Sequence, residues 1–218
     1  MSDSENMMEN LLGEDESLTE KQKKIIIAAI ESFSEKGYAS TSTSEIAKKA
    51  GVAEGTIFRH YKTKKDLLIS IVTPIMSKLI APFVMRDLNK VLDTPFERYE
   101  DFLKAMIINR RDFLQKNFPI LKIMLQEIPF QPELREQFKK HVVKNIGQRL
   151  DALAKHYQGK GEIIEIPTLN VIRFTASTII GYLLSRYLFF PEADWNDEEE
   201  IDRTIQFIMH GLSAKRDN

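Results

Sequence analysis

Residues 42–61 read STSEIAKKAGVAEGTIFRHY, and this stretch predicts two short helices joined by a tight turn. Ser42 and Glu45 have the S-x-x-E spacing of a capping box, in which each side chain bonds the backbone N–H of the other residue. Gly51 stands where the first helix must end, because glycine adopts a left-handed conformation at little cost. A second helix follows, and Ile57 is its clearest inward-facing anchor.

This arrangement is typical of a helix-turn-helix, which lays its second helix in the major groove of DNA and crosses the phosphate backbone with its first. Gly55 and Thr56 are the small and hydrogen-bonding residues that suit the start of such a recognition helix. Glycine inside a helix costs about 1 kcal/mol relative to alanine, and a close approach of DNA to the backbone would explain that cost. The surrounding segment is rich in cations that suit phosphates, namely Lys48, Lys49, Arg59, Lys62, Lys64 and Lys65. The alternative is a small three-helix core with a solvated, lysine-rich face.

The run IAKKAGVAEGTIFRHYKTKKDLL at residues 46–68, preceded by Phe33, Gly37–Tyr38, Thr41 and Ser42, resembles the DNA-binding domain of the TetR family of bacterial transcriptional regulators. The resemblance extends over about Thr19 to Val72. The rest of the chain is similar to family members only in its length and in its all-helical sequence pattern. The resemblance implies an all-α fold. It also implies that an N-terminal three-helix helix-turn-helix DNA-binding domain is followed by a C-terminal helical domain for ligand binding and dimerisation.

The resemblance also implies contacts with phosphates or bases, and the basic segment adds further candidates. The predicted DNA-binding set is Ser42, Thr43, Ser44, Glu54, Gly55, Thr56, Phe58, Arg59, His60, Tyr61, Lys62 and Lys65. Three positions depart from the common pattern: Ala53 stands where a capping serine or threonine is usual, and Phe58 stands where tyrosine is frequent. The third, Glu54, has the wrong charge for a phosphate, although it suits the positive end of a helix and can accept a hydrogen bond from cytosine N4.

The formal net charge of −1 over 218 residues hides an uneven distribution. Residues 1–16 carry six acidic side chains and no Lys or Arg, whereas residues 17–70 carry ten Lys or Arg against six Asp or Glu. Positive charge is therefore concentrated where the motif lies. The absence of cysteine excludes a disulfide and a thiolate metal site, and it fits a reducing compartment.

The chain is expected to form two domains after an acidic start. We expect residues 1–16 to be a disordered acidic leader, 17–72 to be the DNA-binding domain, and 73–218 to be the helical effector-binding and dimerisation domain. The acidic start lacks the basic and apolar regions of a signal peptide. The most apolar later stretch, 174–184, is too short to span a bilayer. We therefore expect a cytoplasmic protein without a membrane partner.

Helix-start signals and periodicity predict the remaining helices. Thr19 with Gln22 opens a helix that Gly37 ends. Thr63 with Asp66 opens a long helix towards Leu79, which Pro74 should kink and Pro82 should end. Four further starts are predicted: Thr94-Pro95-Phe96-Glu97 for a helix to about Lys116, Pro119 for a shorter one, Pro132 for one to about Tyr157, and Pro167 for one to about Phe189. Asn196 should cap the last helix.

The last two predicted helices carry apolar stripes on more than one side. In the family resembled, these helices pair across a two-fold axis as a four-helix bundle. The predicted dimer interface is Ile179, Leu183, Tyr187, Ile205, Ile208 and Leu212. A homodimer also suits DNA recognition, because two coupled recognition helices read a palindrome. The alternative is a monomer with a thick core.

Family resemblance further implies an apolar cavity for an effector in the middle helices. The predicted lining residues are Phe102, Met106, Asn109, Met124, Phe138, Phe174 and Tyr182, with Phe113 as a further apolar candidate. Arg110, His141 and Arg173 are further polar residues that could orient a ligand. For each residue taken singly, ordinary core packing is the alternative. The scarcity of polar anchors favours a hydrophobic or amphipathic effector.

These observations together predict a sequence-specific regulator of transcription that binds double-stranded DNA as a homodimer. It would be a repressor, released from a palindromic operator by a small molecule. Two alternatives belong to other classes: an enzyme or carrier of small apolar molecules that keeps the helix-turn-helix as scaffold, and a helical interaction module whose basic face meets an acidic protein. Four scattered histidines, no cysteine and no nucleophile–base spacing argue against catalysis. We expect no cofactor and no metal.

Overall fold

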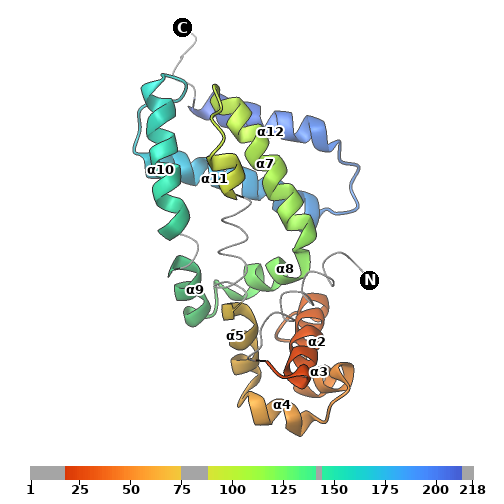
Figure 1. The fold of residues 1–218 in the computed structure, drawn as a ribbon. Coiled ribbons are helices and arrows are strands. Elements are labelled where there is room, and N and C mark those ends of the chain that lie inside the picture. The colour runs from red at the N-terminus through yellow and green to blue at the C-terminus, as the bar shows by residue number, and fades with distance from the viewer. Residues whose placement is uncertain (1–17, 75–87, 141–143, 213–218) are drawn as a thin grey trace. The chain divides into compact units, whose positions relative to one another are not determined.

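The structure is a computed structural model that describes residues 18–74, 88–140 and 144–212, and over these ranges it is helical without strands (Figure 1). The predicted all-α fold is confirmed. None of the described helices is long and apolar enough to cross a membrane. The helices are α2 (Glu20–Lys36), α3 (Thr43–Ala50), α4 (Glu54–His60), α5 (Lys64–Pro74), α7 (Tyr99–Lys116), α8 (Phe118–Glu127), α9 (Pro132–Phe138), α10 (Lys144–Gly159), α11 (Thr168–Leu184), the π-helix η3 (Ser185–Phe189) and α12 (Asp197–Leu212).

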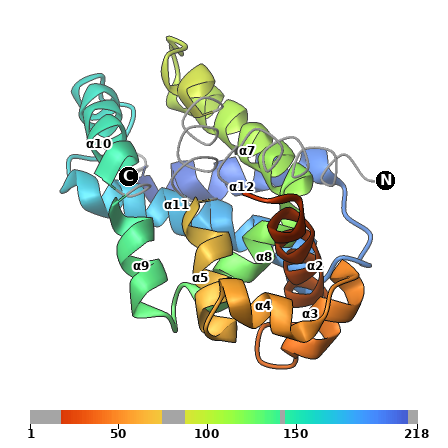
Figure 2. The ribbon, with the colours of Figure 1, turned by 60° about the horizontal axis from the view of Figure 1, so that its bottom comes forward.

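The chain divides into two compact units, Met1–Val84 with Phe113–Val143, and Met85–Asp112 with Lys144–Asn218. In the first unit α3 packs on α2 and α4, and the three helices lie next to one another in both views (Figures 1 and 2). Helix α8 also packs on α2, and α9 packs on α5. The first unit therefore includes two helices that lie beyond the predicted 17–72 domain. The predicted boundary at 72/73 stays a prediction, because residues 75–87 lie outside the described residues.

The predicted first helix is confirmed, and its ends follow from local chemistry. Thr19 and Gln22 form the capping box, with the Gln22 N–H donating to Thr19 Oγ1 at 3.3 Å and the Thr19 N–H donating to Gln22 Oε1 at 3.0 Å. The N–H of Gly37 then donates to the Phe33 carbonyl at 2.9 Å, and Gly37 takes a φ of 82° that side chains resist. The side chain of Phe33 is fully buried and meets the Tyr38 ring edge-on at 5.4 Å.

The predicted helix start at Thr94 is wrong, since α7 begins at Tyr99. The Thr94 hydroxyl bonds backward to the Lys90 carbonyl at 2.6 Å, so it does not cap the residues that follow. The next carbonyls are used in tertiary contacts: that of Phe96 accepts the Tyr157 hydroxyl at 3.0 Å, and that of Glu97 accepts Lys160 Nζ. Tertiary partners therefore satisfy groups that a helix would have used.

The later predicted starts are largely confirmed. Pro119 lies in the first turn of α8, and Pro167 precedes α11 directly. Asn196 precedes α12 and accepts the Glu199 N–H at 3.4 Å. The helix predicted from Pro132 to about Tyr157 appears as α9 and α10, which belong to different units. The predicted effects of Pro74 and Pro82 concern a segment outside the described residues, as does Leu79.

The second unit is built on α7, α10, α11 and α12, with α11 packed between α10 and α12. Its core is aromatic near the start of α7, where the Tyr99 ring stacks on Phe102 at 5.7 Å and meets Tyr157 at 5.0 Å. The backbone N–H of Tyr99 donates to Glu162, which joins the start of α7 to the loop after α10. This loop follows the turn at Gly161, whose φ is 71°.

Candidate DNA-binding surface and ligand cavity

The turn between α3 and α4 has the geometry that the sequence predicts. The Glu45 N–H donates to Ser42 Oγ at 3.1 Å, and the Ser42 N–H donates to Glu45 Oε2 at 3.0 Å. Lys36 Nζ also donates to Glu45 at 2.6 Å, and this bond, helped by those from Ser42, lowers the pKa of Glu45 to about 2. Gly51 ends α3 in the left-handed conformation with φ 67°, and its neighbour Val52 donates to the Ala47 carbonyl at 3.0 Å.

Helix α4 is anchored by one face and leaves the other open. Ile57 is 1% exposed, whereas Phe58 is 47% exposed. A Cβ added at Gly55 would meet open space, so packing within the described chain does not require this glycine. Ala53 makes no side-chain cap. The exposed or half-exposed members of the predicted set on α3, α4 and their flanks are Ser42, Thr43, Ser44, Glu54, Gly55, Thr56, Phe58, Arg59, His60 and Lys62.

Tyr61 is the exception in the predicted DNA-binding set. It is 7% exposed, and it lies directly after the end of α4, four residues beyond the buried Ile57. Burial raises the pKa of its hydroxyl, which interacts with the side chains of Ser70 and Gln22. The structure therefore places the Tyr61 side chain in the core of the first unit, and its assignment as a DNA contact is corrected.

Two neighbouring lysines at the start of α5 have different partners. Lys64 Nζ donates to the carbonyls of Tyr38 at 2.8 Å and of Thr41 at 2.9 Å, and it lies 4.4 Å from the Tyr38 ring centroid. Lys65, a predicted phosphate contact, forms an ion pair with Glu133 of α9 at 2.8 Å. The ammonium group lowers the pKa of the Glu133 carboxyl. Lys65 must therefore exchange a carboxylate for a phosphate if it contacts DNA.

Removing the charge of Glu133 is expected to strengthen DNA binding modestly. An exposed ion pair contributes little to stability, so Glu133→Gln should raise DNA affinity by up to about fivefold. Fluorescence anisotropy on a labelled operator at low salt measures this change. Glu136→Gln is the matched control, because Glu136 lies on the same helix and pairs with Lys139 at 2.9 Å. An equal gain in both variants would mean that overall charge, and not the Lys65 contact, sets the affinity.

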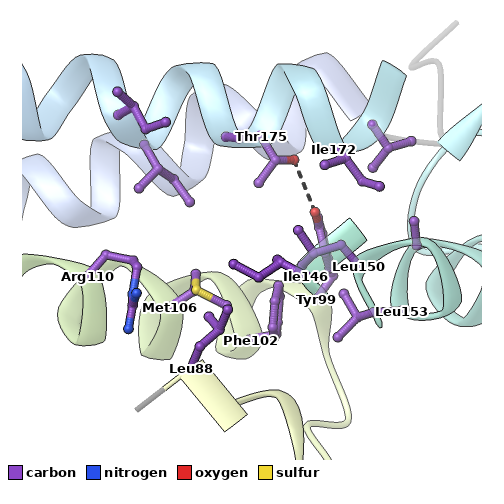
Figure 3. A pocket seen from close by; sticks show the side chains of 15 residues that line it. Leu88, Tyr99, Phe102, Met106, Arg110, Ile146, Leu150, Leu153, Ile172 and Thr175 are labelled. Atoms are coloured by element: carbon purple, nitrogen blue, oxygen red, sulfur yellow. Dashed lines mark hydrogen bonds between the residues drawn. The ribbon is translucent and has the colours of Figure 1, made fainter. Parts of the chain in front are cut away.

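A cavity of about 250 Å³ lies within the second unit. One wall is a stripe on α7 made of Tyr99, Phe102, Met106 and Arg110, and the other walls come from α10, α11 and Leu88 of the segment before α7 (Figure 3). Across the cavity the Tyr99 hydroxyl meets Thr175 Oγ1 at 3.1 Å. The other lining residues are apolar: Leu88, Ile146, Leu150, Leu153, Ala154, Val171, Ile172, Ala176, Ile179 and Ile180.

Arg110 brings the only charged side chain among the lining residues of this cavity. It lies at one end of the labelled row, and Leu153 lies towards the other end (Figure 3). The Arg110 Nε donates to Asn109 Oδ1 at 3.0 Å. Asn109 itself does not line the cavity, so it contacts the lining arginine from outside. A guanidinium at the end of an apolar cavity suits a ligand with an apolar body and an anionic or polar head.

The predicted ligand set is therefore only partly brought together. Phe102 and Met106 line the cavity, whereas Met124 and Phe138 belong to the first unit, as does Phe113. Phe174 packs on Gly211, and the Tyr182 hydroxyl donates to Asp197 at 3.4 Å. Arg173 is exposed and His141 lies outside the described residues. The prediction missed Tyr99 and Thr175. Tyr99 could have been found, because its spacing from Phe102, Met106 and Arg110 places these four residues on one helical face.

Most of the predicted dimer-interface residues are buried within the second unit. Ile179 and Leu183 of α11 and Ile205 and Ile208 of α12 are 0–5% exposed, so they belong to the core of the second unit. Tyr187 is half-buried beside Arg186, 5.0 Å from ring centroid to guanidinium carbon, and the side chain of Leu212 lies outside the described residues. The exposed large apolar residues on these helices are different ones: Leu169, Phe174, Ile180 and Phe207.

Comparison with known proteins identifies the helix-turn-helix segment. A family model described as bacterial regulatory proteins, tetR family, matches residues 25–71. The uncharacterized HTH-type transcriptional regulator YvkB of Bacillus subtilis (strain 168) is 27% identical over 197 residues, which cover 88% of this chain and 97% of YvkB. The fatty acid metabolism regulator protein of the same organism is 47% identical over 60 residues, 28% of this chain. That match spans only 31% of the relative's length. The regulator YuxN, also of Bacillus subtilis (strain 168), is 27% identical over a match that covers 66% of this chain and 48% of YuxN. The chain therefore spans less than half of the length of these two relatives.

Solved structures share the fold of nearly the whole chain. The regulator FadR from Bacillus subtilis, in complex with stearoyl-CoA, has a TM-score of 0.64 at 24% identity and covers 87% of this chain and 98% of its own. PfmR from Thermus thermophilus, a TetR family transcriptional regulator, has a TM-score of 0.65 at 20% identity, covering 91% of this chain and 100% of its own. Together with the motif geometry and the family match, these likenesses lead to one conclusion: residues 25–71 form a DNA-binding domain of the tetR family of bacterial regulatory proteins, and the chain as a whole has the fold of TetR family regulators.

Proposed function

We propose that the protein is a cytoplasmic, homodimeric repressor that binds a palindromic operator and is released from it when a small amphipathic molecule fills the cavity of the second unit. The observation that carries the DNA-binding part is the open face of α4. Its residues are accessible while Ile57 anchors the helix, and Gly55 has no packing role within the described chain. A recognition helix needs one face buried against its own domain and the opposite face exposed to the DNA.

The chemistry of the cavity supports a single narrow acyl chain as effector. Its volume of about 250 Å³ lies below the ~300–1,000 Å³ of sites that hold drug-sized ligands, which disfavours bulky polycyclic molecules. Its lining is apolar apart from Arg110 and the Tyr99–Thr175 pair. The FadR structure, which shares the fold, holds stearoyl-CoA. Saturated fatty acids and their CoA thioesters are therefore the first effectors to test.

The exposed face of α11 and α12 supports a homodimer. Phe174, Ser177 and Gly181 follow one another on the open face of α11, and Phe207 and Gly211 do so on α12. A Cβ at Gly211 would lie 2.8 Å from the tip of the Phe174 ring, so this glycine lets the ring lie across α12. We call these five residues the Phe174–Phe207 face. Large aromatic side chains beside small residues suit close helix packing against a second copy.

Selection of genomic DNA fragments by the purified full-length protein tests the DNA-binding function. Affinity for the selected fragments should fall steeply as salt is added, because phosphate contacts release counterions. Lys65→Ala should weaken binding to all sequences alike, whereas Thr56→Val should weaken binding to selected fragments most. Equal binding of heparin and selected DNA would instead support an interaction module with a basic face. If neither substitution changes DNA affinity, the assigned groove face is wrong.

A further inference from the structure

Glu54 and Thr43 join the starts of the two motif helices. Each is the first residue of its helix, α4 and α3 respectively. The Thr43 hydroxyl donates to Glu54 Oε1 at 2.6 Å, a short bond to a charged acceptor. Glu54 is exposed, so this contact is not required to satisfy a buried carboxylate. The bond holds one carboxylate oxygen of the recognition helix in place while its other oxygen can still accept a hydrogen bond.

Glu54 carries a negative charge at the start of the recognition helix. Among the ion pairs of the described residues, Glu45 is neutralised by Lys36, but none involves Glu54. A carboxylate facing phosphates would oppose DNA binding, because both groups are negative. The first residues of a recognition helix face base edges, where a carboxylate can instead meet an amino group. Its position on α4 therefore favours a base as its partner.

Only some bases fit a carboxylate in the major groove. Guanine presents two acceptors and thymine presents an acceptor and a methyl group, so neither donates a hydrogen bond to Glu54. Adenine presents an amino donor, but the adjacent N7 acceptor would repel the second oxygen. Cytosine presents its N4 amino group without an adjacent acceptor of its own. Cytosine is therefore the base that matches Glu54 best.

We propose that Glu54 reads a cytosine in each operator half-site, and that Thr43 is a positioning residue that orients the Glu54 carboxylate. The proposal rests on the DNA-binding function above and adds the identity of one base and the residue that selects it. Holding Oε1 through Thr43 reduces the side-chain freedom that Glu54 would otherwise lose on binding. Thr43 therefore contributes to discrimination between bases even where it contacts no base itself.

The test compares base preferences selected from random duplex DNA by the wild type and by variants of the full-length protein. Wild type should select cytosine at one position of each half-site, by about five- to twentyfold over other bases. Glu54→Ala should lose this preference, and Glu54→Gln should shift it towards adenine, which glutamine reads through N6 and N7. Thr43→Val should weaken the cytosine preference by about two- to fivefold, with the melting temperature and the other positions unchanged.

Glu35→Gln is the control for loss of a negative charge, since Glu35 lies on α2 and pairs with Lys49 at 3.0 Å. It should leave the base preference unaltered. A uniform gain in affinity for all sequences in Glu54→Gln, larger than in the control, would place Glu54 against phosphate and overturn the proposal. Unchanged preferences in both Glu54 variants would overturn it as well. Failure of the wild type to select any sequence would instead overturn the proposed function.

Discussion

Replacing Phe207 by aspartate is expected to yield a monomer whose affinity for a palindromic operator is lower by about a hundredfold or more, because a lone half-site contact approaches non-specific binding. Phe207 is 68% exposed on α12, and it belongs to the Phe174–Phe207 face. In a homodimer formed through this face, a carboxylate would be buried without a partner, which costs several kcal/mol. Sedimentation equilibrium and operator binding measure the two effects on the same sample.

Phe130→Asp is the matched control for Phe207→Asp. Phe130 is 79% exposed between α8 and α9 of the first unit, so the same substitution there adds the same charge away from the proposed interface. It should leave the protein dimeric and its operator affinity within about twofold, as is usual for surface changes. A Phe207→Asp variant that remains a dimer would show that copies pair through another surface.

The sequence predicted best what depends on residues close together in the chain. The Ser42–Glu45 capping box and the glycine end of α3 involve neighbours, so composition and spacing suffice to locate them. The same reasoning failed at Thr94, whose signal is equally local. There the carbonyls of Phe96 and Glu97 accept hydrogen bonds from residues some sixty positions further along the chain, and no local sequence pattern predicts such partners.

The residues predicted for the dimer interface are mostly buried for a different physical reason. Helical periodicity finds the most apolar face of an amphipathic helix, and that face packs on the helix's own domain first. Ile205 and Ile208 lie on this face of α12 and are buried in the second unit. The exposed face combines Phe207 with Gly211 and polar residues, so a search for the most apolar face of the helix passes over it. The proposed Phe174–Phe207 face is instead marked by large aromatic residues beside small ones.

The ligand cavity could be predicted only in part, because its walls come from separate segments of the chain whose pairing is tertiary. Phe102 and Met106 were found through residue type. Thr175 was not, because nothing in the sequence distinguishes it from the other polar residues of α11. Met124 and Phe138 have the same apolar character but belong to the other unit. Residue type therefore predicts that a side chain is apolar, and the fold decides which apolar residues share a cavity.

Filling the cavity is expected to separate DNA binding from effector response. Ala176 lines the cavity from α11, and Ala176→Trp places an indole in a space of about 250 Å³. In the wild type, a saturating acyl effector should weaken operator binding by about 5- to 150-fold, the usual range of allosteric coupling. In the variant this release should disappear, while operator affinity without effector stays close to that of the wild type, since α4 is untouched.

The measurement is operator binding with and without a series of saturated fatty acids and acyl-CoA thioesters. Ala152→Trp is the control, because Ala152 is exposed on α10 and does not line this cavity. The control should respond to effector as the wild type does. Overpacking costs about 1–3 kcal/mol of stability, so thermal unfolding must confirm that Ala176→Trp is folded at the assay temperature. If a folded Ala176→Trp variant still releases DNA on effector addition, the effector binds elsewhere and the cavity is not the regulatory site.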